Sequence, residues 1–326
     1  MKLLAKPFAI LALLMFSLAG MGQGLKQDIS VHDPVIIKQD SVYYIFCTGS
    51  GISVWSSVNM VDWKREKLVF AEAPQWAVDT IPGFKGHIWA PDISYHNGLY
   101  YLYYSVSAFG KNTSAIGVAT NKTLHPDSPD FKWVDHGRVI QSYPGKTNWN
   151  AIDPNLITDD KGTPYLVFGS FWGGLKMVKL NAGRLSVADD ITNIPTLASR
   201  KKDASASGAN AIEAPFIFKK NKYYYLFASI DYCCKGPASN YKMIVGRSKN
   251  IKGPYVDKQG IAMSKGGGSL ILKPDSNWYG AGHNAVARLN GTDYLVFHGY
   301  DARDNGRPKL RILKMHWKSG WPELAN

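Results

Sequence analysis

Five short apolar runs, rich in tyrosine, phenylalanine and branched aliphatic residues, recur along the chain and predict β-strands. They begin at Tyr43, Tyr100, Tyr165, Tyr223 and Tyr294. Turn-forming sequences precede four of them, namely Asn97-Gly98, Asp159-Asp160-Lys161-Gly162, Lys219-Lys220-Asn221-Lys222 and Asn290-Gly291. The segments on either side of each turn are therefore expected to pair as hairpins.

An ionisable residue stands at the start of each of these five units. The residues are Asp33, Asp92, Asp153, Glu213 and His283, separated by 59, 61, 60 and 70 positions. A period near sixty that is built from short strands is typical of a propeller. The sequence therefore predicts an all-β fold, a five-bladed β-propeller, in which the five residues converge at one end of the central channel.

The remaining segments are assigned to the outer parts of the blades. Third strands are expected at residues 114–119, 175–180 and 242–246, and outer strands near Trp63, Trp133 and Tyr255. The small polar stretch 204–210 is expected to be a loop just before Glu213. Five blades of this size account for residues 25–326 as one catalytic domain, with no linker.

Residues 1–24 have the pattern of a secretory signal peptide. Lys2 and Lys6 are followed by an apolar run from Pro7 to Leu18 and then by small residues. The run is too short for a membrane span, and no later segment is long enough either. We therefore expect a secreted or periplasmic protein without a membrane span, and a buried N-terminal helix is the less favoured interpretation.

The formal net charge of +13 bears on the partner of the protein. Basic residues are spread along the chain, with one dense cluster at Arg200-Lys201-Lys202. A nucleic-acid-binding protein more often shows a basic stripe interleaved with exposed aromatic residues, so nucleic acid is not expected as a partner. An acidic polysaccharide or cell surface fits an exported basic protein better, and a merely soluble basic surface fits as well.

Three cysteines are too few for a disulfide-based scaffold. Cys47 lies in an apolar run and is expected to be a small buried hydrophobic residue. The adjacent pair Cys233-Cys234 can form a disulfide in an oxidising compartment or stay reduced, and the sequence leaves both alternatives open.

Three of the repeated ionisable residues are carboxylates that suit glycosidic bond hydrolysis. This reaction needs one carboxyl group to protonate the leaving oxygen and another to attack or to activate water. Asp33, Asp153 and Glu213 supply such groups from the first, third and fourth repeats. Proline follows Asp33 and Asp153 directly, which predicts a rigid, extended backbone there. The alternative is that these Asp-Pro pairs simply begin strands. For Asp92 we expect a role in sugar binding or in support of the site.

Five motifs carry a resemblance over nearly the whole mature chain. They are Val31-His32-Asp33-Pro34, Gly86-His87-Ile88-Trp89-Ala90-Pro91-Asp92, Asn150-Ala151-Ile152-Asp153-Pro154-Asn155, Phe168-Gly169-Ser170-Phe171-Trp172-Gly173-Gly174 and Ile212-Glu213-Ala214-Pro215. In this order and spacing the chain resembles the five-bladed propellers of family 43 glycoside hydrolases, and specifically the α-1,5-L-arabinanases. The resemblance implies an inverting hydrolase with Asp33 as general base, Glu213 as general acid and Asp153 as the residue that orients and tunes the acid.

The same resemblance implies a calcium ion at the propeller axis, bound largely through water, with His283 nearby. A structural role for this histidine is the alternative, because one imidazole alone is a poor calcium site. Sugar binding needs exposed aromatic faces, and Trp89, Phe109 and Trp172 follow or flank the repeated ionisable residues in loops. Substrate binding is therefore expected at residues within or beside the motifs, namely Trp89, Asp92, Phe109, Asn155, Ser170 and Trp172. For Trp89, Phe109 and Trp172, packing in the core is the alternative.

These observations predict an enzyme that cleaves internal α-1,5-L-arabinofuranosyl linkages of arabinan, the side chain of pectin, as a monomer. An exo-acting α-L-arabinofuranosidase or β-xylosidase of the same family is the first alternative. Such enzymes often carry an additional β-sandwich, for which no residues remain here. A carbohydrate-binding propeller without catalysis is the second alternative, and the presence of all three carboxylates argues against it.

Overall fold

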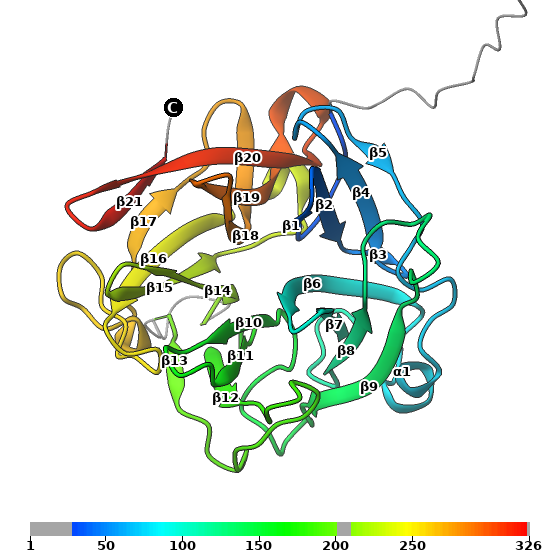
Figure 1. Ribbon diagram of the computed structural model, residues 1–326. Helices are drawn as coiled ribbons and strands as arrows, with labels where there is room; N and C mark the ends of the chain where they lie inside the picture. Colours follow the sequence, from blue (N-terminus) through cyan, green and yellow to red (C-terminus); the bar gives the residue numbers. More distant parts are fainter. Residues whose placement is uncertain (1–27, 201–209, 325–326) are drawn as a thin grey trace, which may run out of the picture.

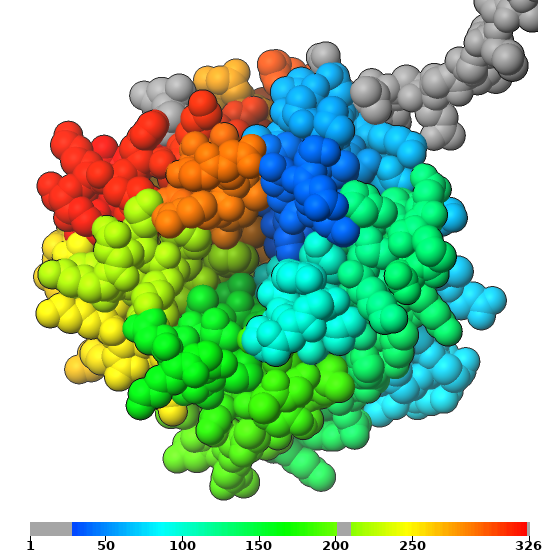
Figure 2. Space-filling view, in the orientation of Figure 1, coloured from blue at the N-terminus to red at the C-terminus, as the bar shows by residue number. Residues whose placement is uncertain are grey.

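The computed structural model describes residues 28–200 and 210–324 and shows five antiparallel sheets arranged as a ring (Figure 1). The predicted five-bladed β-propeller is therefore confirmed. The chain passes through the blades in sequence, so the first and fifth blades lie side by side, as the blue and orange surfaces show in Figure 2. In the described residues, no helix is long and apolar enough to cross a membrane.

In each blade four strands pair in chain order as an antiparallel meander, and one short strand between blade-one strands pairs with blade two instead. Blade one contains β1 (Val35–Gln39), β2 (Val42–Cys47), β4 (Ser53–Ser57) and β5 (Lys64–Arg65). Blade two contains β6 (His87–His96), β7 (Leu99–Val106), β8 (Ala115–Asn121) and β9 (Val134–Gln141), with β3 (Gly49–Ser50) paired to β6. Blade three contains β10 (Asn155–Thr158), β11 (Pro164–Phe168), β12 (Leu175–Lys179) and β13 (Thr196–Ala198).

Blade four contains β14 (Ile212–Lys220), β15 (Tyr223–Ile230), β16 (Lys242–Ser248) and β17 (Ser269–Leu272). Blade five contains β18 (Trp278–Leu289), β19 (Thr292–Asp301), β20 (Arg307–Lys318) and β21 (Trp321–Leu324). The helical elements are the short α1 (Gln75–Thr80) and the 3₁₀ turns η1 (Gly236–Ala238), η2 (Met263–Lys265) and η3 (Ala302–Asp304).

All four predicted hairpin turns join the first and second strands of their blades. Asn97 and Gly98, for example, connect β6 to β7 with His96 paired to Leu99. The outer strand expected near Tyr255 is wrong, because this tyrosine lies in a connection where Val256 makes only isolated bridges, and the fourth strand is β17. The predicted signal peptide at 1–24 and residues 204–209 of the predicted loop lie outside the described residues.

The hydrophobic core is divided among the five interfaces between neighbouring blades. Between blades one and two, for instance, Tyr44 and Phe46 pack against Leu102 and Tyr104. The ring closes between blades five and one, where Ile29 and Val31 join a cluster with Val296 of β19. Because every blade is packed between two others, the inner strands are fixed in position around the axis.

Candidate active site

Five residues with left-handed backbone conformation mark the true repeat of the propeller. They are Asp33, Ala90, Asp153, Ala214 and His283, with φ between 43° and 58°. The extended backbone predicted before the prolines is therefore wrong. The repeat position predicted for two of the ionisable residues is wrong as well, since Asp92 lies two positions after Ala90, and Glu213 lies one position before Ala214.

A hydrogen bond from the backbone N–H of each left-handed residue explains how this uncommon conformation is maintained. In four cases the acceptor is a side chain that lies in the second strand of the preceding blade or directly after it. These pairs are Asp33 with His298 (3.1 Å), Ala90 with Thr48 (2.8 Å), Asp153 with Ser105 (3.0 Å) and His283 with Ser229 (2.8 Å). The blades are thus connected to one another at the level of the inner strands.

Blade three departs from this pattern. Its equivalent position is Gly169, which has no side chain to offer, and a Cβ there would lie 2.7 Å from the carbonyl oxygen of Gly174. The N–H of Ala214 instead donates to Oδ2 of Asp153 at 3.0 Å. A carboxylate of the site therefore replaces the missing acceptor and is directly bonded to the backbone next to Glu213.

Asp33 lies at the centre of a dense group of donors. His32 and His283 each place Nδ1 on its Oδ1, at 2.8 Å and 3.1 Å, and the Thr48 hydroxyl donates to its Oδ2 at 2.6 Å. Burial alone would raise the pKa of this carboxyl, but electrostatic attraction and hydrogen bonds from His283 and His32 bring the pKa well below its ordinary value. Asp33 is therefore a carboxylate at neutral pH.

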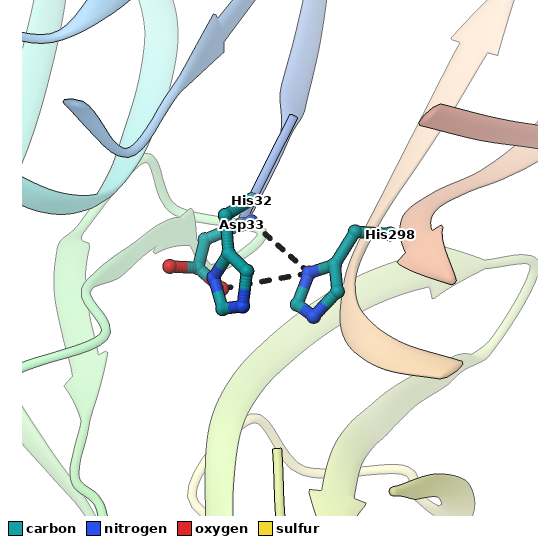
Figure 3. A group of neighbouring side chains, drawn as sticks. All are labelled: His32, Asp33 and His298. Atoms are coloured by element: carbon teal, nitrogen blue, oxygen red, sulfur yellow. Dashed lines mark hydrogen bonds and ion pairs between the residues drawn. The ribbon is translucent and has the colours of Figure 1, made fainter. Parts of the chain in front are cut away.

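His298 approaches Asp33 from blade five, and its ring faces both the backbone and the carboxylate (Figure 3). Its Nδ1 accepts the N–H of Asp33, so the ring proton is on Nε2 and the 3.6 Å distance from Nδ1 to Oδ1 separates two acceptors. Burial lowers the pKa of His298 well below its ordinary value, in agreement with a neutral ring.

Glu213 has the opposite electrostatic character. The Ser170 hydroxyl donates to its Oε2 at 2.8 Å, and the buried hydroxyl of Tyr241 lies close by, without a hydrogen bond of good geometry. Burial raises the pKa of Glu213, although Tyr241 and Ser170 lower it. Gly282 makes room for the Tyr241 ring, since a Cβ there would lie 2.1 Å from it. The residue is thus biased toward the protonated acid.

Asp153 and His283 complete the cluster around the axis. Burial raises the pKa of Asp153 to about 7, with His283 lowering it and Glu213 raising it. Burial alone would lower the pKa of His283, but the carboxylates Asp33 and Asp153 outweigh this effect and raise the pKa to about 9. The structure therefore brings the predicted catalytic residues and His283 into one electrostatically coupled group, with the positive imidazole between carboxylates.

Asp92 and Asn155 are buried and make contacts between blades. Asp92 accepts the N–H of Leu156 at 2.7 Å and the amide of Asn155 at 3.3 Å, while Asn155 accepts the N–H of Ile217 at 2.8 Å. Burial raises the pKa of Asp92 to about 7. These contacts connect blades two, three and four, and they engage both carboxylate oxygens of Asp92 with protein groups.

The other predicted substrate-binding residues differ in exposure. Phe109 and Trp172 are 82% and 39% exposed, so neither is a core residue, whereas Trp89 is half-buried and donates from Nε1 to Nδ1 of His87. Trp89 precedes the left-handed Ala90 as Glu213 precedes Ala214, which gives the two side chains equivalent places on the inner strands. Ser170 is buried and donates its hydroxyl hydrogen bond to Glu213.

Two sets of donors are relevant to a metal ion. His32, Asp33 and His298 place ligand atoms within 4.8 Å of one another, but the Nδ1 atoms of both histidines are engaged with Asp33. His283 fits better, because its Nδ1 is directed to Asp33 and no hydrogen bond within the described residues engages its Nε2. This carboxylate-histidine arrangement is the one that orients metal-binding imidazoles. The neighbouring Asn284 adds a buried amide without a partner among the described residues.

Several residues of the site were not predicted, namely His32, Thr48, Tyr241, His298 and Tyr300. Thr48, directly after β2, and His298 of β19 each lie opposite the residue before a left-handed one, as Ser105 and Ser229 do, so the repeat itself carries a signal for them. In the sequence, Tyr241 and Tyr300 resemble the many other aromatic residues of the strands, so nothing indicates that they belong to the site.

Comparisons with known proteins agree with this geometry. The profile described as Glycosyl hydrolases family 43 matches residues 28–322. The chain is 50% identical to an extracellular exo-α-(1→5)-L-arabinofuranosidase of Cellvibrio japonicus, covering 96% of this chain and 90% of that protein. It is 42% identical to an extracellular endo-α-(1→5)-L-arabinanase of Bacillus subtilis, covering 90% and 87%. An α-L-arabinanase of Cellvibrio cellulosa complexed with arabinohexaose superposes with a TM-score of 0.87 at 49% identity, covering 91% of this chain and 96% of that one.

Proposed function

Because the chain belongs to glycosyl hydrolase family 43, we propose that it hydrolyses the α-1,5-linked L-arabinofuranosyl bonds of arabinan. The observation that carries this proposal is the opposite shift of two carboxyl groups in one cluster, with the pKa of Asp33 lowered and that of Glu213 raised. A pair of this kind supplies the base and the acid of glycoside hydrolysis at the same pH. The relatives that act on arabinan support the choice of substrate.

Asp33 serves as the general base. Its carboxylate is ionised, and the donors His32, His283 and Thr48 fix its orientation. In the proposed single displacement, Asp33 takes a proton from a water molecule while the water oxygen attacks the anomeric carbon.

Glu213 serves as the general acid. Its proton passes to the glycosidic oxygen as the bond between that oxygen and the anomeric carbon breaks. The Ser170 hydroxyl donates to Oε2 of Glu213, so Oε1 is the carboxyl oxygen that Ser170 does not engage. Glu213 ends the step as a carboxylate and Asp33 as an acid, so one proton exchange with solvent restores both.

Asp153 positions and tunes this acid. Its Oδ2 bonds the backbone N–H of Ala214, the residue after Glu213, and this contact fixes the strand that carries the acid. The two carboxyls are electrostatically coupled, and a negative charge on one disfavours ionisation of the other. Asp153 therefore helps Glu213 to retain its proton without touching the reacting atoms.

A calcium ion at the axis is part of the proposal. His283 would bind it through Nε2, and the oxygen atoms of water molecules would supply most of the other ligands. When bound, the ion supplies a fixed positive charge near the three carboxylates. His283 must lose a proton to bind a metal, so its raised pKa predicts weaker binding as pH falls.

The cleavage pattern is a separate point, on which the relatives differ. The sequence predicts internal cleavage, whereas the relative that is 50% identical is named as exo-acting and the one at 42% as endo-acting. Higher identity over a larger share of the chain favours exo action, and we place it first, with endo action as the second candidate.

Digestion of linear arabinan tests the activity and its pattern together, with xylan and galactan as controls. We expect soluble arabinose or one short arabino-oligosaccharide from the start of digestion if the enzyme is exo-acting. A ladder of mixed oligosaccharides at early times would mean endo action, and hydrolysis of xylan or galactan alone would contradict the substrate. Because both relatives are named extracellular, we further propose that the protein is exported.

A further inference from the structure

We propose that the Cys233-Cys234 disulfide turn, acting through Tyr300 and His32, positions the general base Asp33. The two adjacent cysteines are bonded to each other, which settles the alternative left open by the sequence. The inference rests on the proposed function, because it concerns the efficiency of the same hydrolytic step. Its elements come from three parts of the chain, namely the start of blade one, the loop after β15 and the strand β19.

The disulfide turn lies beside the base. The backbone N–H of Cys234 donates to the Tyr300 hydroxyl oxygen at 2.7 Å, and the Cys234 sulfur lies 3.9 Å from Nε2 of His32. The Tyr300 hydroxyl is itself 2.8 Å from that same nitrogen. The turn is therefore connected to Asp33 through Tyr300 and His32, because Nδ1 of His32 contacts the carboxylate at 2.8 Å.

The hydrogen-bond directions in this group are mutually determined. Because His298 accepts the N–H of Asp33 at Nδ1, its Nε2 carries the proton and donates to the Tyr300 oxygen at 3.3 Å. That oxygen also accepts from Cys234, so the tyrosine proton is directed to Nε2 of His32. His32 must then carry its proton on Nδ1, which donates to Asp33.

In this assignment each N–H and O–H group of the hydrogen-bonded series donates to the next residue, and the series ends on the carboxylate of Asp33. With Thr48 and His283 also donating, Asp33 is constrained from three directions, and the path from Cys234 supplies one of them. Tyr300 is 2% exposed and His298 is fully buried, so water cannot readily replace a lost partner. The His32 and His298 rings also stack with centroids 3.9 Å apart, which couples their orientations.

The turn is itself fixed against blade five. A Cβ on Gly306 would lie 2.5 Å from the backbone nitrogen of Pro237, so only glycine permits this close approach of the loop to η3. A disulfide between neighbouring residues restricts the backbone at the point where Cys234 presents its N–H. Opening the disulfide should therefore release that donor and weaken the orientation of Tyr300.

Reduction of the purified protein by dithiothreitol tests this directly. The dithiol supplies two electrons and two protons, becomes a cyclic disulfide and leaves two thiols at Cys233 and Cys234. We expect kcat on arabinan to fall about tenfold, with KM changed less than about twofold, because the base is misplaced while substrate contacts remain. A rise in KM with unchanged kcat would overturn the inference and identify the exposed disulfide as a surface for the sugar.

Variants separate positioning from folding. Tyr300→Phe removes only the hydroxyl and should lower kcat about tenfold, and the Cys233→Ala/Cys234→Ala double variant should lower it and become insensitive to dithiothreitol. Because both changes act along one path, the triple variant should be no slower than Tyr300→Phe alone. Multiplicative losses would contradict a shared path.

Two controls complete the test. Tyr255→Phe removes a buried tyrosine hydroxyl that bonds the carbonyl of Ile251 away from the axis, and it should leave kcat unchanged. Cys47→Ala, which removes the buried free thiol, should keep the response to dithiothreitol. A wild-type protein inactive on arabinan would refute the proposed function, whereas an active protein with unaltered kcat in the Tyr300→Phe and reduced forms would refute only this inference.

Discussion

Oδ2 of Asp153 accepts the backbone N–H of Ala214 at 3.0 Å and thereby bonds blade three to the residue that follows the candidate acid Glu213. The other left-handed inner-strand residues receive a neutral or histidine acceptor at this point. The use of a carboxylate here gives one side chain two effects, a hydrogen bond that positions the strand and a charge that acts on the acid.

Two substitutions separate these effects. Asp153→Asn retains an oxygen acceptor but removes the charge, so the pKa of Glu213 should fall and the alkaline limb of kcat/KM should move to lower pH. Asp153→Ala also removes the acceptor and should reduce kcat further, by about tenfold or more. The measurement is the pH profile of arabinan hydrolysis for the three proteins, and identical alkaline limbs would contradict the electrostatic role.

Replacement of Glu213 tests the assignment of the acid. Glu213→Ala should lower kcat on arabinan by a factor of about 10² to 10⁴, because the leaving oxygen no longer receives a proton in the transition state. An aryl arabinofuranoside with a nitrophenolate leaving group needs little protonation, so the loss on it should be much smaller. Equal losses on both substrates, in a variant with a wild-type circular dichroism spectrum, would argue against an acid at this position.

The sequence predicts most of the fold but only part of the candidate active site. Tyrosine-rich strands and turn sequences such as Asn97-Gly98 are local signals, and they predict the hairpins correctly. Matching ionisable residues to one another gives the wrong repeat position for Asp92 and Glu213. The prolines Pro34, Pro91, Pro154 and Pro215 instead align Ala90 and Ala214 with Asp33, in agreement with the structure.

The left-handed backbone could not be predicted from the local sequence, because a residue before proline normally prefers extended conformations. At Asp33 it is supported by His298, which lies 265 positions away in the chain. Tyr300 is a similar case, since its role depends on the backbone of Cys234 in another blade. Contacts of this kind arise only once the ring has closed.

Asp293 offers a prediction for stability. Its carboxylate is 2% exposed as a side chain and accepts hydrogen bonds from Lys220 of blade four and from Arg288 and Trp317 of blade five. Burial raises its pKa, but these donors lower it below the ordinary value. Asp293→Asn should reduce the free energy of unfolding by about 2 kcal/mol at neutral pH, because its hydrogen bonds lose their charged acceptor.

The sign of the pH dependence follows from the lowered pKa. The contribution of Asp293 is fully present above the pKa of the unfolded chain and is lost as pH falls through the folded-state pKa. Urea unfolding of both proteins should therefore show a difference that is largest near neutral pH and shrinks in acid. A difference that grows as pH falls would contradict the assignment.

Removal of divalent ions tests the proposed calcium site. Treatment with a chelator should lower the melting temperature or kcat, and added calcium should restore the lost property. His283→Gln, which removes the imidazole ligand, should weaken both responses. If exhaustive chelation changes neither property and no ion is detected in the protein by elemental analysis, the calcium proposal fails and His283 acts through Asp33 alone.

The anomeric configuration of the first product tests the central claim most directly. If Asp33 activates water while Glu213 protonates the leaving oxygen, hydrolysis of α-linked arabino-oligosaccharides proceeds in one displacement. Proton NMR during the first turnovers should then show the β-anomer, followed by slow mutarotation. Initial appearance of the α-anomer would mean retention through a covalent intermediate and would contradict the assignment of Asp33 as a general base.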